Sequence, residues 1–244
     1  MSAQPFNHPV PQDGVAPRPD AERTPQRISM LVRAGRPAPQ LIMAHTPDDP
    51  RAEELRALRT ELLLRRAPED DRADVVALVS PCSGEGRSQL AAELAISYAQ
   101  LGRSTLLIDA DLRSPRQHAL FAVDDRVGLS RAVNRGVAPR LHAVDGLPDL
   151  YVVTAGANAS NPLEVLLHDR FANMFEEWSQ SFEFIVIDTP AMTPYSDGLA
   201  VACLAGRVLV LSRAQHTPYR NTREMFRRLD AARAEVLGAV ISHF

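Results

Sequence analysis

Apolar runs and amphipathic segments alternate along the chain from about residue 50 to its last residue. Short runs rich in Val, Ile and Leu predict β-strands over residues 74–80, 104–109, 150–154, 182–188, 207–212 and 235–242. Segments with helical spacing lie between them, over residues 88–100, 169–180, 197–204 and 219–233. Because the strands are apolar almost throughout and alternate with helices, the pattern predicts an α/β fold with a mostly parallel sheet and helices on both faces.

A further helix is predicted before the first strand. Leu55, Leu58 and Leu62 recur at i, i+3 and i+7, which is typical of a helix that begins after Pro50 and ends near Arg66. Upstream of it, ten of the 19 prolines fall within residues 1–50. Proline fixes the backbone and removes a hydrogen-bond donor, so we expect a disordered proline-rich tail over residues 1–48 and one domain over residues 49–244.

Composition and charge narrow the classes of partner. The 244 residues include 30 acidic and 27 basic side chains, which give a formal net charge of −3. This composition does not indicate binding to nucleic acid or to an anionic membrane. All the basic residues are arginine, so any chemistry that needs a lysine must proceed without one.

Two cysteines suggest neither a disulfide framework nor a zinc site, and no run approaches the roughly 18 apolar residues of a spanning helix. We therefore expect a cytoplasmic protein that reaches the membrane only through a partner.

The first predicted strand runs through a glycine-containing loop, Ser-Pro-Cys-Ser-Gly-Glu-Gly-Arg-Ser, into a helix. Strand, loop and helix in this order form a phosphate cradle, in which glycines let backbone N–H groups approach the phosphates and a hydroxyl binds Mg²⁺. Ser88 occupies the hydroxyl position, but Pro81 and Arg87 replace the glycine and lysine of the strict eight-residue template. Taken alone, the loop is equally compatible with a glycine-rich turn before a buried helix.

Carboxylates follow two further predicted strands. Asp109 and Asp111 lie at the end of the strand predicted over residues 104–109, and Asp188 ends the strand predicted over residues 182–188. Ligands of parallel sheets bind beyond the carboxyl ends of the strands, and P-loop proteins hold Mg²⁺ or its water shell with such carboxylates. The alternative is a set of helix N-caps, which suits Asp111 better than Asp109 or Asp188. Because three uncompensated acids at one edge repel one another, a Mg²⁺–phosphate complex explains them better than packing does.

The segments VSPCSGEGRSQ, LLIDADLRSPRQHALF, LPDLYVVTAGANASNPLEVLL and FIVIDTPAMTPYSDGLAVA carry a family resemblance, in order and at the usual spacing. They resemble the bacterial tyrosine kinases of capsule and exopolysaccharide biosynthesis, from about Glu53 to the last residue. The resemblance implies a three-layer P-loop NTPase fold that binds ATP and Mg²⁺ and transfers the γ-phosphate to protein tyrosine. It also implies a homo-oligomer that docks on a membrane polysaccharide co-polymerase, here encoded as a separate chain.

The resemblance also assigns roles to individual positions. The phosphate loop would bind the nucleotide through Ser83, Gly84, Glu85, Gly86, Arg87, Ser88 and Gln89. Ser88, Asp109 and Asp188 would bind the metal or its water shell, and Asp109, Asp111 and Arg87 would serve catalysis. On the first helix, Glu53, Arg56 and Arg59 reproduce a Glu-x-x-Arg-x-x-Arg pattern that mediates ring assembly in those kinases. The alternative for these three residues is an ordinary solvated helix face.

Two departures from the family pattern leave two functions open. Arg87 brings a planar fork where the family has the compact charge of a lysine, which should permit nucleotide binding but weaken phosphoryl transfer. The chain also stops directly after its last predicted strand, without a tyrosine-rich tail, and its tyrosines are Tyr98, Tyr151, Tyr195 and Tyr219. The chain is thus either an active tyrosine kinase or a catalytically weak, nucleotide-sensing subunit of a polysaccharide export complex.

A third alternative is a partition or division-site ATPase of the same fold. Those proteins carry an additional lysine in the phosphate loop, at the position that Cys82 occupies here, and often a membrane-targeting C-terminal helix. Neither feature is present in this sequence, so this alternative is the weakest of the three.

Overall fold

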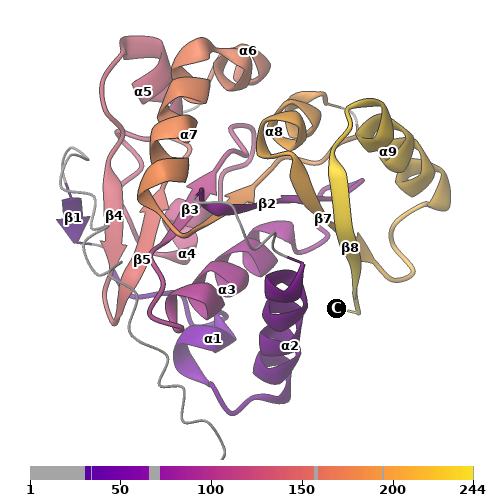
Figure 1. Cartoon of the computed structure of the whole chain (residues 1–244), viewed down its shortest axis with the longest axis horizontal. Helices are drawn as coiled ribbons and strands as arrows, with labels where there is room; N and C mark the ends of the chain where they lie inside the picture. Colours follow the sequence, from indigo (N-terminus) through magenta and orange to yellow (C-terminus); the bar gives the residue numbers. More distant parts are fainter. Residues whose placement is uncertain (1–30, 34, 66–71, 157–158, 194, 244) are drawn as a thin grey trace, which may run out of the picture.

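The computed structural model describes residues 31–33, 35–65, 72–156, 159–193 and 195–243. Within them, eight strands form one sheet in the order β1-β4-β5-β3-β6-β2-β7-β8, with helices on both faces (Figure 1). The strands are β1 (Leu31–Arg33), β2 (Asp74–Val79), β3 (Thr105–Asp109), β4 (Leu141–Val144), β5 (Leu147–Val153), β6 (Phe184–Asp188), β7 (Arg207–Arg213) and β8 (Glu235–Ser242). The helices are α1 (Ile42–His45), α2 (Pro50–Leu64), α3 (Arg87–Ala99), α4 (Gln117–Leu120), α5 (Leu129–Arg135), α6 (Pro162–Leu167), α7 (Asp169–Ser181), α8 (Asp197–Ala205) and α9 (Tyr219–Ala231).

The sheet is parallel from β5 to β8, which confirms the predicted α/β class. β2 pairs with β6 on one side and with β7 on the other, and β3 pairs with β6 and β5. Every residue of β3 and β6 is buried, as expected of strands covered on both faces. All the strands predicted from the sequence are present, with ends within about three residues of the expected ones.

Two strands were not predicted, and both lie at one side of the sheet. β4 runs antiparallel to β5, and β1 pairs in parallel with β4. Asp145-Gly146 joins β4 to β5, and Gly146 has a φ of +79°, the left-handed conformation that tight hairpins favour. β4 is short and carries a histidine among its apolar residues, so its hydrophobic pattern alone does not mark it as a strand.

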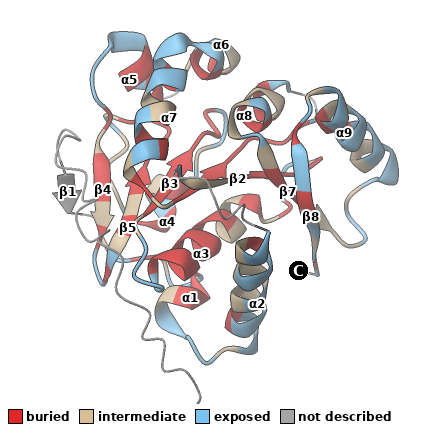
Figure 2. Ribbon diagram, viewed as in Figure 1, coloured by how far each residue is buried: buried red, intermediate tan, exposed pale blue. Residues whose placement is uncertain are grey.

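Strands β2 and β3 are largely buried (Figure 2), and alternate residues of the central strands belong to two separate cores. Leu78 packs with α1, α2 and α3, whereas its neighbours Ala77 and Val79 pack on the face covered by α7, α8 and α9. On the first face, four of the ten buried residues of α3 are alanines, which lets the helix lie close to the sheet, and Tyr98 stacks on Phe184 with ring centroids 4.3 Å apart. This close packing fixes the helix whose first turn borders the phosphate loop.

The folded unit begins earlier than the boundary expected at residue 49. Leu41 and Met43 are buried in the core beneath α3, although both were assigned to the disordered tail. The carboxylate of Glu93, itself 2% exposed, accepts hydrogen bonds from the backbone N–H groups of Ile42 (2.7 Å) and Met43 (2.9 Å). A run of Leu, Ile and Met therefore anchors the chain here despite its proline-rich surroundings. Residues 1–30 of the expected tail lie outside the described residues.

Replacing Glu93 should detach α1 from α3. Glu93→Ala leaves the N–H groups of Ile42 and Met43 buried without an acceptor, so we expect the free energy of unfolding to fall by about 2–3 kcal/mol. Glu61→Ala, at an exposed position of α2, is the control and should change it by less than about 0.5 kcal/mol. Urea denaturation of both variants measures the difference, and equal midpoints would contradict the anchoring role.

Candidate functional site

The phosphate loop lies where the sequence predicts it, between β2 and α3. Gly84 and Gly86 have φ values of +77° and +89°, a conformation that side-chain-bearing residues rarely adopt. A pocket of about 410 Å³ opens at the N-terminus of α3. It is lined by all the loop residues predicted to bind nucleotide, namely Ser83, Gly84, Glu85, Gly86, Arg87, Ser88 and Gln89, and also by Asp111, Ser114, Arg116 and Leu120. The loop thus has the form of an anion cradle rather than of a simple turn.

Glu85 braces the loop from inside the protein. Its carboxylate accepts hydrogen bonds from the backbone N–H of Cys82 (2.8 Å) and from the hydroxyl of Thr217, and the residue is only 1% exposed. Ser242 donates to the Glu85 carbonyl, and Asn221 donates to the Cys82 sulfur at 3.3 Å. The Glu85 side chain is therefore engaged by Cys82 of the loop and by Thr217 before α9, and its carbonyl is engaged by Ser242 of β8.

The carboxylates predicted at the strand ends do come together. Asp109 and Asp188 are register partners in the pairing of β3 with β6, so both side chains leave the sheet at the same edge. Asp111 follows two residues later, and all three residues are buried. Burial, together with the neighbouring carboxylates, raises the pKa values of Asp109 and Asp188.

Asp109 uses both of its carboxylate oxygens within the protein. One accepts from the backbone N–H of Asp111 at 3.2 Å, and the other accepts from those of Arg116 (3.1 Å) and Gln117 (2.9 Å) at the start of α4. Burial and the neighbouring charge of Asp188 raise the pKa of Asp109 well above its usual range. The predicted capping role thus applies to Asp109, which accepts from N–H groups at the start of α4. Asp111 makes the same kind of contact, because it accepts from the backbone N–H groups of Arg113 and Ser114.

Asp188 is arranged differently. One of its oxygens accepts from the side-chain amide of Gln117 at 2.8 Å, while Oδ1 is buried without a hydrogen-bond partner among the described residues. Burial raises the pKa of Asp188, and the charge of Arg87 opposes that rise. The Gln117 amide also donates to the carbonyl of Ser88 at 3.0 Å, so it fixes Asp188 beside the first turn of α3. A carboxylate oxygen that accepts no hydrogen bond and a serine hydroxyl beside it are the kind of donor pair that Mg²⁺ uses.

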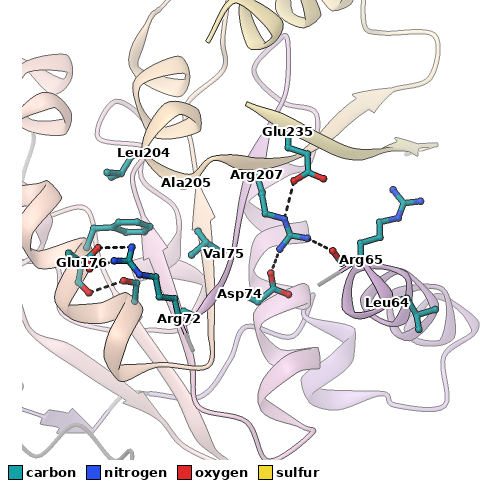
Figure 3. A pocket seen from close by; sticks show the side chains of 13 residues that line it. Leu64, Arg65, Arg72, Asp74, Val75, Glu176, Leu204, Ala205, Arg207 and Glu235 are labelled. Atoms are coloured by element: carbon teal, nitrogen blue, oxygen red, sulfur yellow. Dashed lines mark hydrogen bonds and ion pairs between the residues drawn. The ribbon is translucent and has the colours of Figure 1, made fainter. Parts of the chain in front are cut away.

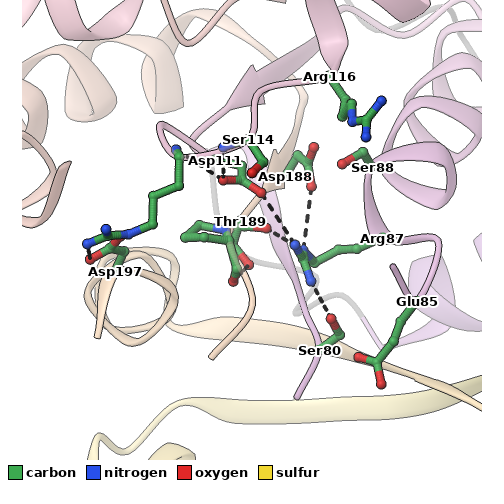
Figure 4. A network of polar contacts seen from close by, with 12 residues as sticks. Ser80, Glu85, Arg87, Ser88, Asp111, Ser114, Arg116, Asp188, Thr189 and Asp197 are labelled. Atoms are coloured by element: carbon green, nitrogen blue, oxygen red, sulfur yellow. Dashed lines mark hydrogen bonds and ion pairs between the residues drawn. The ribbon is translucent and has the colours of Figure 1, made fainter. Parts of the chain in front are cut away.

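Arg87 turns into this cluster instead of outward from the loop (Figure 4). It donates from Nε to the carbonyl of Thr189 and from Nη1 to the hydroxyl of Ser80. Nη2 lies 3.5 Å from Asp111 Oδ2, and Nε lies 3.7 Å from Asp188 Oδ1. The side chain is 7% exposed, so the charge of Arg87 is almost fully removed from solvent in this arrangement.

Some residues around the site were not singled out from the sequence. Ser114 and Arg116 line the pocket, and the Arg116 side chain has no ion-pair partner within the described residues, which leaves it available to an anion. Gln117 connects Ser88, Asp109 and Asp188, as described above. These residues follow the Asp109–Asp111 strand end, so the rule that ligands bind beyond strand ends could have extended the prediction to them.

The tyrosines differ greatly in accessibility. Tyr98 is buried, and burial raises its pKa. Tyr195 is 41% exposed and its ring lies 3.7 Å below the guanidinium of Arg113, which pairs with Asp197. Tyr219, at the start of α9, is 81% exposed. Tyr195 and Tyr219 are therefore the tyrosines with the most accessible rings among those the structure describes.

Helix α2 carries the predicted assembly motif, and the side chains of its three residues lie in different surroundings. Glu53 and Arg56 form an exposed ion pair at 3.0 Å, and Arg56 also donates to the carbonyl of Pro47. Arg59 instead turns inward and donates to the carbonyl of Ser97 on α3 at 2.8 Å, where burial lowers its pKa. Glu53 and Arg56 are thus free to meet another molecule, whereas Arg59 holds α2 against α3.

Another pocket, of about 490 Å³, lies at the amino ends of the strands, away from the phosphate loop (Figure 3). Its charged residues are already paired within the protein. Arg207 contacts Asp74, Glu235 and the carbonyl of Arg65, and Arg72 pairs with Glu176 at 2.8 Å. This pocket lacks the glycine-rich backbone of the phosphate-loop site, and no carboxylate oxygen that lines it is buried without a hydrogen bond.

The described residues contain neither a metal-binding cluster of side chains nor a membrane-spanning helix. No group of three or more of their His, Cys, Asp or Glu side chains is arranged to hold a metal ion by itself. None of the helices is both long enough and apolar enough to span a membrane.

Comparison with known proteins identifies relatives by sequence, although no family model matches the chain. EpsB from Ralstonia nicotianae is 33% identical over 204 residues, which cover 83% of this chain and 27% of that protein. CapB from Staphylococcus aureus is 30% identical over 192 residues, which cover 78% of this chain and 83% of CapB. Both relatives carry the names of tyrosine-protein kinases. The chain therefore spans most of CapB but about a quarter of EpsB.

Solved structures agree with these relatives. The chimerical protein CapA2B2 superposes with a TM-score of 0.78 at 26% identity, covering 90% of this chain and 97% of that one. The kinase domain of the Escherichia coli tyrosine kinase ETK gives 0.76 at 26% identity, covering 83% and 79%. The cell division ATPase MinD of Pyrococcus furiosus gives 0.60 at 22% identity over 69% and 71%, a likeness of fold alone. With its P-loop NTPase fold and its similarity to CapB over most of both chains, the protein belongs to the family of bacterial tyrosine-protein kinases.

Proposed function

We propose that the chain binds Mg·ATP and transfers the γ-phosphate to protein tyrosine, as a kinase of exopolysaccharide or capsule biosynthesis. The observation that carries this proposal is Oδ1 of Asp188, which is buried beside Ser88 and the glycine-rich cradle, accepts no hydrogen bond and lies 3.7 Å from the guanidinium of Arg87. A buried carboxylate oxygen that accepts no hydrogen bond is costly unless a ligand satisfies it. Mg²⁺ or its water shell would do so.

The residues present fit Mg²⁺ and a nucleotide. The Ser88 hydroxyl and Asp188 would hold the ion or its water shell, and the ion would neutralise charge that develops on the transferred phosphoryl group. Backbone N–H groups of Gly84 to Ser88 and the N-terminus of α3 would bind the phosphates, with Arg116 at the rim. Asp109 would act as a positioning residue, because its oxygens are committed to the start of α4.

Asp111 is the carboxylate best placed to accept the phenol proton. It lines the pocket and, unlike Asp109, is not fully enclosed. One of its oxygens caps the following turn, and the other faces Arg87. In the proposed reaction the phenol oxygen attacks the γ-phosphorus, the bond to the bridging β–γ oxygen breaks, and ADP leaves while the proton passes to Asp111.

A second candidate function rests on Arg87. Its contacts to Ser80, Thr189, Asp111 and Asp188 keep it away from the mouth of the loop, where a lysine would reach the β- and γ-phosphates. A protein with this arrangement could bind nucleotide and oligomerise without efficient transfer, as a nucleotide-sensing subunit of a polysaccharide export complex. Nucleotide-dependent partitioning is not favoured, because the division ATPase shares the fold alone.

The partner that we propose is a membrane polysaccharide co-polymerase encoded as a separate chain. The likeness to the chimerical protein CapA2B2, 97% of which this chain covers, supports this proposal. We further propose that the protein works at the cytoplasmic face of the membrane, where ATP is available, and that it assembles there as a homo-oligomer through Glu53 and Arg56.

Incubation with Mg·ATP followed by phosphotyrosine mass spectrometry decides between the two functions. The kinase should carry phosphate on one or more of its tyrosines or on an added tyrosine peptide, and Asp188→Asn should reduce the signal by at least tenfold because the metal loses a carboxylate. Asp149→Asn, on β5 and outside the pocket, is the matched control. Nucleotide binding without any phosphotyrosine would support the sensing subunit instead.

Arg87→Lys should increase phosphoryl transfer. A lysine cannot make the four contacts of the guanidinium fork, so its ammonium is released to the phosphates. Correct positioning of one charge is worth about tenfold or more in rate, which a radioactive ATP assay would detect. Turnover that stays at or below that of the unchanged protein would show that Arg87 does not limit the chemistry.

The exposed ion pair of α2 should control assembly. Arg56→Glu reverses the charge at the motif without removing a core contact, so we expect any oligomer to shift toward monomer. Light scattering after size exclusion gives the mass of each species. Arg51→Glu on the same helix is the control, and an equal effect of both variants would indicate general charge repulsion rather than a specific interface.

A further inference from the structure

The guanidinium of Arg87 lies against the carboxylates at the edge of the phosphate pocket. It faces Asp111 and Asp188, at 3.5 and 3.7 Å (Figure 4), and Arg87 is one of the residues that line the pocket, together with Gly86 and Ser88. In a P-loop site, the space between acidic strand ends and phosphate oxygens is where Mg²⁺ acts. A permanent positive charge belonging to the chain therefore already lies next to the proposed metal position.

Three separate strand ends hold that charge in place. Ser80 follows β2, Asp111 follows β3, and Thr189 follows β6, and each supplies an oxygen to a different nitrogen of Arg87. An arginine has five N–H donors in a rigid planar fork, whereas a lysine has a single nitrogen on a flexible stem. Only an arginine can contact all of these oxygens at once.

The charges of the cluster make this arrangement stable. Burying a carboxylate without a counter-charge is costly, and Asp188 is fully buried. Arg87 supplies a counter-charge that needs no ion from solution. The same neutralisation lowers the gain from adding a divalent cation, because Mg²⁺ would have to approach a site where a guanidinium already lies within 4 Å of the carboxylates.

We propose that Arg87 acts as an internal cation, so that this site binds nucleoside diphosphates and triphosphates with little dependence on Mg²⁺. The proposal rests on the nucleotide site of the proposed function and adds a specificity to it. Arg87 neutralises the carboxylates that would otherwise hold Mg²⁺, so that Mg²⁺ would add little to nucleotide binding. Arg87→Lys removes the guanidinium contacts and restores a site that needs the metal.

The test is isothermal titration of the full chain with ADP, once with excess Mg²⁺ and once with EDTA. For the unchanged protein, the two dissociation constants should agree within about threefold. For Arg87→Lys, Mg²⁺ should tighten binding by at least about tenfold, the effect of one charge-assisted contact. Arg103→Lys is the matched control, since Arg103 pairs with Glu183 at the opposite end of the strands, and it should behave as the unchanged protein.

Each outcome decides the proposal. If the unchanged protein binds ADP only with Mg²⁺, the internal-cation role is overturned while the nucleotide site stands. If it binds ADP under neither condition, the nucleotide site of the proposed function fails as well. Should Arg87→Lys not fold, as judged by its thermal melt, the two titrations of the unchanged protein still give the answer, because the proposal predicts their ratio directly.

Discussion

The crowding of Asp109, Asp111 and Asp188 at one edge of the sheet is the constraint around which the site is organised. Strand pairing places two of these acids side by side, and burial removes the water that would otherwise screen them. The protein compensates with backbone N–H groups of α4, the amide of Gln117 and the guanidinium of Arg87. Position 87 thereby links the phosphate loop to the acidic strand ends, and the glycine-rich loop and the carboxylates form one electrostatic unit.

The other side of the loop depends on residues much later in the chain. Glu85 contacts Thr217, and Ser242 at the end of β8 contacts the Glu85 carbonyl. The loop is therefore held between two groups of contacts, acidic strand ends on one side and the β7–α9 connection on the other. Such fixation keeps the N–H groups of the cradle in place before a ligand arrives, and preorganised donors stabilise charge more effectively than mobile ones.

Much of this architecture could be read from the sequence, because buried parallel strands leave continuous apolar runs and their ends gather at one edge. That logic correctly brought Asp109 and Asp188 to the phosphate loop. It failed where the pattern is weak, as for β4 at the side of the sheet, and where a proline-rich stretch hid the buried Leu41 and Met43. The inward turn of Arg87 could not be predicted either, since its partners come from three strands that are adjacent only in the folded sheet.

The order of strands in the sheet also bears on how the protein folds. β2 leads into the phosphate loop, yet its neighbours are β6 and β7, more than a hundred residues farther along the chain. The hairpin of β4 and β5 can close locally, whereas the central pairings require long loops to close first, which slows folding. During synthesis on the ribosome, the cradle acquires its carboxylate partner only after β6 has emerged, so the ability to bind a ligand is one of the last properties that the growing chain gains.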